Sequence, residues 1–476
     1  MKTAGNGREK EKKKRCEMAK QYVCDMTSGN EMSLLIKFSV PMLIGNIAQQ
    51  MYNTVDSIVV GKYVGDNALA AVGSASPILN LLLVLFIGIS VGASIMVSQY
   101  FGAREKEELA STVGTCVTLT ALSSALIMFA GPLIVPPLLH LLNTPESIFY
   151  WCRDYLNILF IGVSGLAYYN ILSGILRGLG DSISALAYLL VATVLNIVLD
   201  IVFVASFDMG VAGVALATAI AQAVSAVLCM WKLLHMKDIF ELHLKDFIPT
   251  GKHTLDMVRL GLPSGVTQAI FSMAMIVVQS LTNSFGEAFI AANVIVMRVD
   301  GFAMMPNFSF GTALTTYAGQ NVGAKKYDRV TQGAKQGTLI AAGVSGFITV
   351  LILIFGKHLM GVFTNTPGLV DLSMHLMRIL AIGYVAMAVT QGLSGIMRGA
   401  GDTMTPMWIS LLTTVAVRVP IAYGISWMTR TPELPTGNSD CIYISLLISW
   451  LFGALLTFMF YKKGNWKQKG LRGEAI

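Results

Sequence analysis

Charged residues are scarce in this sequence. Asp, Glu, Lys and Arg make up only 13% of its 476 residues, and 54% are hydrophobic, whereas a soluble domain carries about 25% charged residues. Apolar stretches such as 183–206 and 331–356 exceed the roughly 20 residues that cross a bilayer as a helix, and they are too long for barrel strands. The composition therefore predicts an integral membrane protein.

Cysteine and histidine are also rare and lack the spacing of metal or catalytic sites. The chain has six cysteines, without CxxC spacing: Cys16, Cys24, Cys116, Cys152, Cys229 and Cys441. We expect them to be small buried side chains rather than a disulfide framework. The six histidines form no i, i+4 pair, and "GVSGL" around Ser164 lacks the spacing of a nucleophile elbow. The sequence predicts neither an enzyme, nor catalytic residues, nor an organic cofactor.

Twelve apolar stretches remain, and because lipid offers no partners to backbone N–H and C=O groups, each should be a helix. They cover about residues 35–60, 68–98, 109–137, 151–175, 183–206, 210–234, 256–284, 288–318, 331–356, 370–396, 403–428 and 441–461. The predicted fold class is an all-α membrane protein of twelve transmembrane helices.

The basic residues predict the orientation of these helices. Of the 34 Lys and Arg residues, 26 lie in or beside the two tails and the loops that follow even-numbered spans. The positive-inside rule then predicts a multi-pass protein of the cell (plasma or inner) membrane with both termini cytoplasmic. The tail segment "REKEKKKR" suits anionic lipid better than nucleic acid, so no nucleic-acid partner is expected, and the chain is predicted to be a monomer.

The sequence contains an internal duplication. "LSGILRGLGD" at 172–181 is repeated as "LSGIMRGAGD" at 393–402, and "SQYFGAR" at 98–104 is repeated as "GQNVGAK" at 319–325, at the same offset along the chain. We therefore predict a tail (1–32), a six-helix bundle (33–234), a cytoplasmic linker (235–255), a second bundle (256–461) and a tail (462–476). Two parallel bundles related by a pseudo-twofold axis around a central cleft are typical of alternating-access transporters.

Polar residues follow one face of several predicted spans. The stripe in the first span consists of Asn46, Gln49, Asn53 and Asp56, and the fifth span has Thr193, Asn196 and Asp200. Asn and Gln could simply bond helices together. A carboxylate is a costly residue for that purpose inside a membrane. Asp56, Asp200 and Thr218 of the sixth span fall at similar predicted depths, so their oxygens suit Na⁺ or a shared proton, with the two carboxylates as the metal ligands if the ion is Na⁺.

The second half has no acid at the position equivalent to Asp56. It has Arg298 and Asp300 in the eighth span and Arg418 in the eleventh, and Asp300 could pair with Arg418 across helices. A structural or gating ion pair and a substrate contact are both open. Flexible side chains suit a cleft that accepts many shapes. The predicted cleft residues are Gln49, Met51, Asn53, Gln268, Met275, Gln279, Met297 and Asp300.

Together, the duplication, "LRGLGD", "MRGAGD" and "QNVGAK" resemble the multidrug and toxic compound extrusion (MATE) family over about residues 33–461. The resemblance implies export of cationic or amphipathic compounds, driven by inward movement of Na⁺ or H⁺. The DinF-like branch has an Asp in the first span, an Asn-x-x-x-Asp pair in the fifth and a Thr in the sixth. These match Asp56, Asn196, Asp200 and Thr218.

A second branch uses a Glu in the seventh span and an Asp in the tenth. Here the seventh span offers Gln268 and Gln279, and the tenth offers Thr390 and Gln391. The resemblance therefore favours ion coupling in the first bundle. Flippases for lipid-linked saccharides belong to the same superfamily and are the alternative function.

Overall fold

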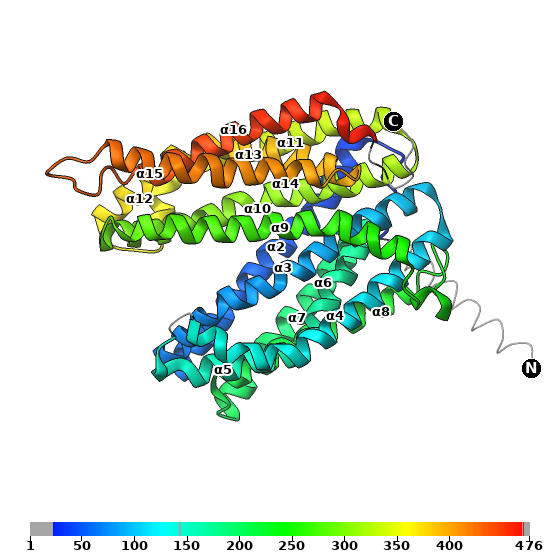
Figure 1. The fold of residues 1–476 in the computed structure, drawn as a ribbon, viewed down its shortest axis with the longest axis horizontal. Helices are drawn as coiled ribbons and strands as arrows, with labels where there is room; N and C mark the ends of the chain where they lie inside the picture. The colour runs from blue at the N-terminus through cyan, green and yellow to red at the C-terminus, as the bar shows by residue number, and fades with distance from the viewer. Residues whose placement is uncertain (1–21, 142–143, 469, 471–476) are drawn as a thin grey trace, which may run out of the picture. The chain divides into compact units, whose positions relative to one another are not determined.

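The computed structural model describes residues 22–141, 144–468 and 470, which are helices and connecting turns without a strand. Most of the predicted tail at 1–32 and the end of the tail at 462–476 lie outside the described residues. The long elements are α2 (Glu31–Val59), α3 (Asp66–Ala103), α4 (Lys106–Leu141), α5 (Glu146–Ile161), α6 (Val163–Gly178), α7 (Ser182–Ile201), α8 (Gly210–Leu234), α9 (Gly251–Asn283), α10 (Glu287–Gly323), α11 (Tyr327–Gly361), α12 (Pro367–Leu380), α13 (Gly383–Gly399), α14 (Met404–Leu411), α15 (Val419–Met428) and α16 (Cys441–Lys463) (Figure 1).

Short segments of other helix types extend or link these helices. Three are π-helical, η1 (Val60–Val64), η2 (Val202–Ser206) and η4 (Leu412–Arg418), and two are 3₁₀ turns, η3 (Leu244–Phe247) and η5 (Asn465–Gln468). A π-helical turn contains one residue more than an α-helical turn, so it rotates the side chains that follow it.

Ten helical segments of the described chain are long and apolar enough to cross a membrane, and two bent pairs bring the number to twelve. The pairs are α5 with α6, bent by 53°, and α12 with α13, bent by 46°. Gly162 and Gly383 lie at the two bends. A Cβ on Gly162 would lie 2.6 Å from Cβ of Ala219 on α8, so the close approach requires glycine there. The predicted all-α membrane fold is confirmed, although two of its spans are not straight.

The duplication is visible in the backbone as well as in the sequence. Gly65 and Gly286 precede α3 and α10 with φ of 108° and 88°, and Arg104 and Lys325 follow those helices with φ of 60° and 57°. Each pair is separated by the same offset as the repeated sequence blocks. Non-glycine residues seldom adopt positive φ. The same unusual capping geometry therefore occurs twice, as expected for two copies of one fold.

The described chain divides into two compact units. Unit 1 contains residues up to Asp25 and Val40–Gly265, and unit 2 contains Met26–Ser39 and Val266 onward. Two helices are therefore shared, because α2 begins in unit 2 and continues in unit 1, whereas α9 begins in unit 1 and continues in unit 2. Each shared helix has an internal proline, Pro41 or Pro263, close to the point of passage.

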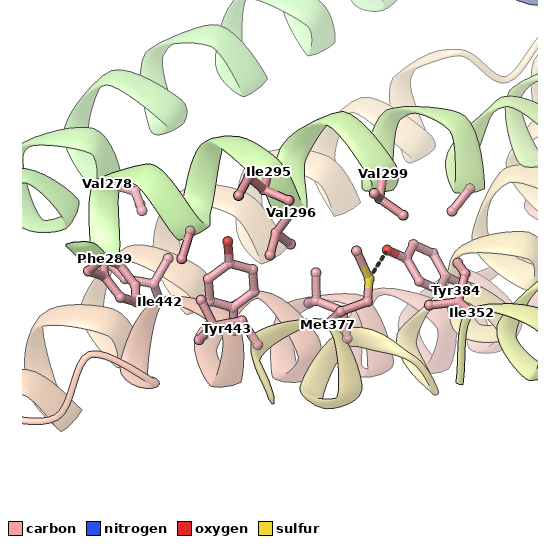
Figure 2. Packing of buried hydrophobic residues seen from close by; sticks show 14 of the residues in the cluster. Val278, Phe289, Ile295, Val296, Val299, Ile352, Met377, Tyr384, Ile442 and Tyr443 are labelled. Carbon is pink, nitrogen blue, oxygen red and sulfur yellow. Dashed lines mark hydrogen bonds between the residues drawn. The ribbon is translucent and has the colours of Figure 1, made fainter. Parts of the chain in front are cut away.

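Within each unit, the helices pack through small residues and buried apolar clusters. In unit 1, a Cβ on Gly261 of α9 would lie 2.5 Å from the carbonyl oxygen of Gly88 on α3. In unit 2, the cluster around Phe289, Ile295 and Tyr443 joins α10 to α16 (Figure 2). Lipid is as apolar as a protein core, so close van der Waals packing, rather than exclusion of water, holds such helices together.

Candidate functional site

The two predicted carboxylates lie in unit 1, each just before a π-helical segment. Asp56 is on α2, four residues before Val60 begins η1, and Asp200 is on α7, two residues before Val202 begins η2. Such π-helical turns are rare and concentrate at functional sites. The sequence pattern that predicted the polar stripes assumes 3.6 residues per turn, so it did not predict these changes of helix type.

The structure brings the four predicted ion-binding residues together. The carboxyl groups of Asp56 and Asp200 lie close enough to interact electrostatically. Asn196 lies one turn before Asp200, and its Nδ2 is 3.5 Å from Oγ1 of Thr218 on α8. Asn196 and Asp200 are completely buried, and Asp56 is partly buried. Residues from three helices therefore form one buried polar cluster.

This cluster has acceptor oxygens without donors. Among the described residues, nothing donates a hydrogen bond to Oδ1 or Oδ2 of Asp200, Oδ1 of Asp56 or Oδ1 of Asn196, although all four oxygens are buried. A buried acceptor without a partner costs about 1–3 kcal/mol, and more if it is charged. A proton or a cation placed among these oxygens would remove that cost and the repulsion between the two carboxylates.

The oxygen ligands present suit a hard cation or a proton rather than a transition metal. In the described parts of the chain, no group of three or more His, Cys, Asp or Glu side chains could hold a metal ion. Two carboxylates with one amide oxygen and one hydroxyl are enough for Na⁺, and a single proton shared between the carboxylates needs fewer ligands.

Two tyrosines that the sequence reasoning did not include face the same cluster. Tyr52 is buried one turn before Asp56, and its hydroxyl lies within electrostatic range of both carboxyl groups but has no hydrogen-bond partner among the described residues. Tyr155 of α5 also lies near Asp56 and Asp200. The i, i+4 spacing of Tyr52 and Asp56 could have revealed the first of them. Tyr155 lies on a different helix, so no spacing along the sequence predicts that it lies near the two carboxylates.

The predicted cleft residues divide between the two units. Unit 1 contains Gln49, Met51 and Asn53 of α2, and unit 2 contains the other five. Gln49 and Asp300 are partly buried, and the remaining six are exposed at the surface of their own unit: Met51, Asn53, Gln268, Met275, Gln279 and Met297. Exposure makes these six available to a ligand but equally to lipid.

Asp300, which could pair with Arg418, has a hydrogen bond from a residue that the sequence did not suggest. Oδ1 of Asp300 accepts a hydrogen bond from the Tyr384 hydroxyl at 2.9 Å, and that hydroxyl also lies 3.2 Å from the Met377 sulfur (Figure 2). Arg418 lies near enough to influence Asp300, but its Nε is buried without a partner among the described residues. Arg418 is the last residue of the π-helical segment η4. Arg298 is exposed.

The MatE family model matches the chain twice, at residues 41–202 and again at 263–424. These two ranges cover most of the chain and coincide with the two copies of the repeat. The chain belongs to the MATE family. It is therefore a multi-pass membrane transporter and not an enzyme, and both predictions are confirmed.

Several relatives match almost the whole length of this MATE protein. "Probable multidrug resistance protein YpnP" of Bacillus subtilis is 30% identical over 445 residues, covering 93% of this chain and 97% of the relative. "Probable multidrug resistance protein YoeA" of the same organism is 30% identical over 441 residues, covering 91% and 93%. "Probable multidrug resistance protein NorM" of Thermotoga maritima is 23% identical, covering 92% and 93%.

Solved MATE structures share the fold of this chain. The structure titled "Outward-facing conformation of a multidrug resistance MATE family transporter of the MOP superfamily" aligns with a TM-score of 0.85 at 24% identity, covering 92% of this chain and 96% of the other. A MOP superfamily transporter from Pyrococcus furiosus aligns with a TM-score of 0.84, also at 24% identity, covering 92% and 97%.

Proposed function

We propose that this MATE protein exports cationic or amphipathic small molecules in exchange for Na⁺ or H⁺ by alternating access. The names of the relatives support multidrug export. The main support for ion coupling is a group of buried acceptor oxygens on Asp56, Asp200 and Asn196. Among the described residues, these oxygens have no hydrogen-bond donors. A site that lacks only positive charge is suited to hold a proton or Na⁺ for part of the cycle and to be empty for the rest.

In the proposed cycle, the ion enters from the outside and binds between Asp56 and Asp200. Binding removes the repulsion between the two carboxylates and fixes α2 against α7 within unit 1. The ion drives transport only if its affinity differs between the outward-open and inward-open states. Thr218 orients Asn196 through the contact between their side chains, and Tyr52 limits the space around the ion. Release of the ion to the cytoplasm then restores the state that loads the substrate.

The proposed substrate contacts are exposed methionine, glutamine and asparagine side chains, those of α2 in unit 1 and those of α9 and α10 in unit 2. Such side chains adapt their shape and offer dipoles rather than fixed charges, which suits varied organic cations. We further propose that the protein acts as a monomer in the cell (plasma or inner) membrane with both termini in the cytoplasm. Fluorescent-protein and alkaline phosphatase fusions at the C-terminus test the orientation, and light scattering of the purified protein tests the monomer.

The central test is efflux of a fluorescent cation from proteoliposomes in which the Na⁺ and pH gradients are imposed separately. We expect one gradient to drive efflux by the wild type and neither to drive efflux by Asp56→Asn. Asp208→Asn is the matched control, because Asp208 is an exposed aspartate of the same unit, and it should transport like the wild type. Full transport by Asp56→Asn would show that this carboxylate does not couple the ion.

The alternative function is that of a flippase, and the two functions are distinguished by the substrate that the protein moves. A drug-sensitive host that expresses the chain should gain resistance to cationic dyes under the export proposal. Movement of a lipid-linked saccharide between leaflets, with no such resistance, would favour a flippase.

A further inference from the structure

The first turns of the two shared helices are each anchored by an ion pair within the unit where the helix begins. Glu31 opens α2, and its Oε1 lies 2.9 Å from Nη1 of Arg329 on α11, in unit 2. His253 lies in the first turn of α9, and its Nε2 is 2.8 Å from Oε2 of Glu108 on α4, in unit 1. Both pairs are distant in the sequence, so they belong to the packing of each unit rather than to one helix.

These two ion pairs occupy equivalent positions of the repeat with reversed charge. Arg329 follows Glu108 at the offset of the repeated sequence blocks, and Glu31 and His253 precede the internal prolines of their helices by the same spacing. The acid is on the incoming helix α2 in one copy and on the receiving helix α4 in the other. We call these pairs the α2 anchor (Glu31 and Arg329) and the α9 anchor (His253 and Glu108).

The packing beside the anchors is repeated too, which supports their equivalence. One turn along α2, Leu35 is buried against Gly337, where an added Cβ would lie 2.9 Å from Cδ1 of Leu35. At the equivalent place on α9, Met257 is buried and its sulfur lies 4.0 Å from the sulfur of Cys116. The two copies have therefore kept the same docking geometry while the charges in it have been exchanged.

The α2 anchor has a permanent cation and several additional hydrogen bonds. Nη2 of Arg329 donates to the carbonyl of Gly29 at 3.0 Å, and the N–H of Met26 donates to Oε1 of Gln320 at 2.8 Å. Arginine keeps its charge at every physiological pH. A change of pH in the neutral range therefore leaves the charge of the Arg329 side unchanged.

The α9 anchor contains a buried histidine as its central cation. The His253 side chain is 4% exposed, and its Nδ1 faces the hydroxyls of Thr250 and Ser111. The Tyr100 ring of α3 lies 6.0 Å away. Lys252 has its Nζ 3.8 Å from Oε2 of Glu108. The charged residues within about two turns of the pair along the chain also include Glu105 and Glu107 beside Glu108, and Asp256 and Arg259 on α9. Lys252 is largely exposed, so solvent weakens its contribution.

Histidine is the side chain whose charge changes between about pH 5 and 8. Neutral His253 can still donate from Nε2 to Glu108, and protonated His253 donates the same bond with a full positive charge. The bond from neutral His253 is already charge-assisted, because its acceptor is a carboxylate. A protonated ring adds the attraction between two opposite charges at the same distance. Protonation of His253 therefore tightens the α9 anchor and leaves the α2 anchor as it is.

We propose that the α2 and α9 anchors hold the first turns of the two shared helices in place, with the charges exchanged between the two repeats. Of the two ion pairs, only the α9 anchor changes its strength with the pH on its own side of the membrane. Glu31, Arg329, His253 and Glu108 act as positioning residues and are not among the residues of the proposed coupling site. Acidification strengthens the contact between the first turn of α9 and α4. It therefore slows any conformational change in which this contact must break. The inference concerns local docking and does not depend on which substrate is exported.

Hydrogen–deuterium exchange of the purified full-length protein tests the inference without any transport. We compare the first turn of α9 with the first turn of α2 in the same sample, at pH 7.5 and pH 5.5, after correction for intrinsic exchange rates. In the wild type, protection of the α9 turn relative to the α2 turn should rise about 5- to 10-fold on acidification, because the protonated ring gains the attraction of the carboxylate. An unchanged ratio would overturn the proposal.

The decisive variant is the double substitution His253→Glu with Glu108→Arg, which copies the polarity of the α2 anchor. It should restore protection of the α9 turn and abolish its pH dependence, whereas Glu108→Arg alone should leave the turn unprotected at both pH values. If Glu108→Arg does not fold, His253→Gln replaces it, because glutamine keeps an N–H donor for Glu108 but cannot be protonated, and its ratio should be independent of pH. A double variant that keeps the wild-type pH dependence would refute the role of His253.

A second measurement connects the anchor to transport and rests on the proposed function. Efflux by the wild type should slow when the pH on the side of the α9 anchor falls, and efflux by the double variant should not slow in this way. If no variant transports any dye, the proposed function fails while the exchange result still stands. If wild-type exchange is independent of pH although transport is normal, only the anchor proposal fails.

Discussion

The hydroxyl of Tyr384 lies 2.9 Å from Oδ1 of Asp300, a carboxylate for which the sequence offered Arg418 as a possible partner. Tyr384 comes from α13 and Asp300 from α10, so the bond joins two helices of unit 2 that pack along much of their length. It supplies a donor to a partly buried carboxylate. The bond stabilises the fold of this unit whatever the substrate is.

Tyr384→Phe removes this donor and should lower the free energy of unfolding by about 1.5–3 kcal/mol, the range for hydrogen bonds to a charged group. Thermal unfolding of the detergent-purified protein measures the change. Tyr443→Phe is the matched control, because the Tyr443 hydroxyl donates to the neutral Oδ1 of Asn293 at 2.6 Å. It should cost less, about 0.5–1.5 kcal/mol. Equal losses in the two variants would show that the charge of Asp300 is not involved.

Gly180→Ala and Gly286→Ala test the close approach of the segment before α2. Both glycines have positive φ, 90° and 88°, so both substitutions introduce strain of about 1–3 kcal/mol. A Cβ on Gly180 would also meet the carbonyl of Cys24, whose N–H bonds to the Gly180 carbonyl at 3.1 Å, whereas a Cβ on Gly286 would meet nothing within 4 Å. Gly180→Ala should therefore destabilise the protein more.

Labelling of Cys24 gives a second measure of the same substitution. Cys24 is partly buried, while Cys116, Cys152, Cys229 and Cys441 are buried, so a maleimide in a Cys16→Ser background should react first at Cys24. Gly180→Ala should speed this reaction and Gly286→Ala should not. Unchanged labelling in both variants would mean that Cys24 does not depend on the Gly180 loop.

The carboxyl of Asp181 predicts a pH dependence of stability. Asp181 caps α7, where it accepts hydrogen bonds from the N–H and hydroxyl of Ser184 at 2.9 and 2.7 Å. Burial raises the pKa of this carboxyl above its ordinary value of 3.8, and the bonds from Ser184 and the charge of Lys232 offset only part of that effect. A raised pKa in the folded state means that stability is greatest below the unfolded pKa and is lost as the pH rises through the folded pKa.

Asp181→Asn removes this titration, and asparagine caps a helix almost as well as aspartate. The melting temperature of the variant minus that of the wild type should therefore rise as the pH increases above about 4, and level off above the raised pKa. The substitution also removes the 3.7 Å contact with Lys232. This loss shifts the difference in melting temperature at every pH but does not change how that difference varies with pH. A difference that falls as the pH rises would contradict the prediction.

Thr218→Val should weaken binding of the coupling ion. The substitution keeps the shape of the side chain but removes the hydroxyl that lies beside Asn196 Nδ2. We expect the ion concentration for half-maximal efflux to rise about tenfold, with the maximal rate little changed, because the carboxylates remain. Thr193→Val is the control, since its hydroxyl bonds the Leu189 carbonyl of its own helix. A similar effect in both variants would assign the loss to packing.

The sequence predicted the fold class and the repeat because both depend on local patterns. Apolar length identifies membrane helices, and the equivalent blocks at 172–181 and 393–402 fix the register of the duplication. It also predicted that Asp56 and Asp200 would be candidates, because charge inside an apolar run is conspicuous. The ion-binding roles of these residues are still proposals.

Other features could not be predicted because they depend on contacts between distant residues. Tyr155 reaches the carboxylates from another helix, and the π-helical turns depart from the 3.6-residue period on which helix prediction rests. The choice between Tyr384 and Arg418 as the partner of Asp300 depends on the direction of side chains after η4. No pattern along the chain specifies that direction.

The reversed charges of the two anchors also have a consequence for biosynthesis. Glu31 is synthesised about 300 residues before Arg329, a delay of roughly 15–60 s at usual translation rates. During that time, the only equivalent receiving position on the nascent chain is Glu108, which repels Glu31. We expect this repulsion to keep the first turn of α2 from docking on α4 and to leave it for Arg329 on α11. We therefore expect the exchange of charges between the repeats to distinguish two similar docking sites during synthesis.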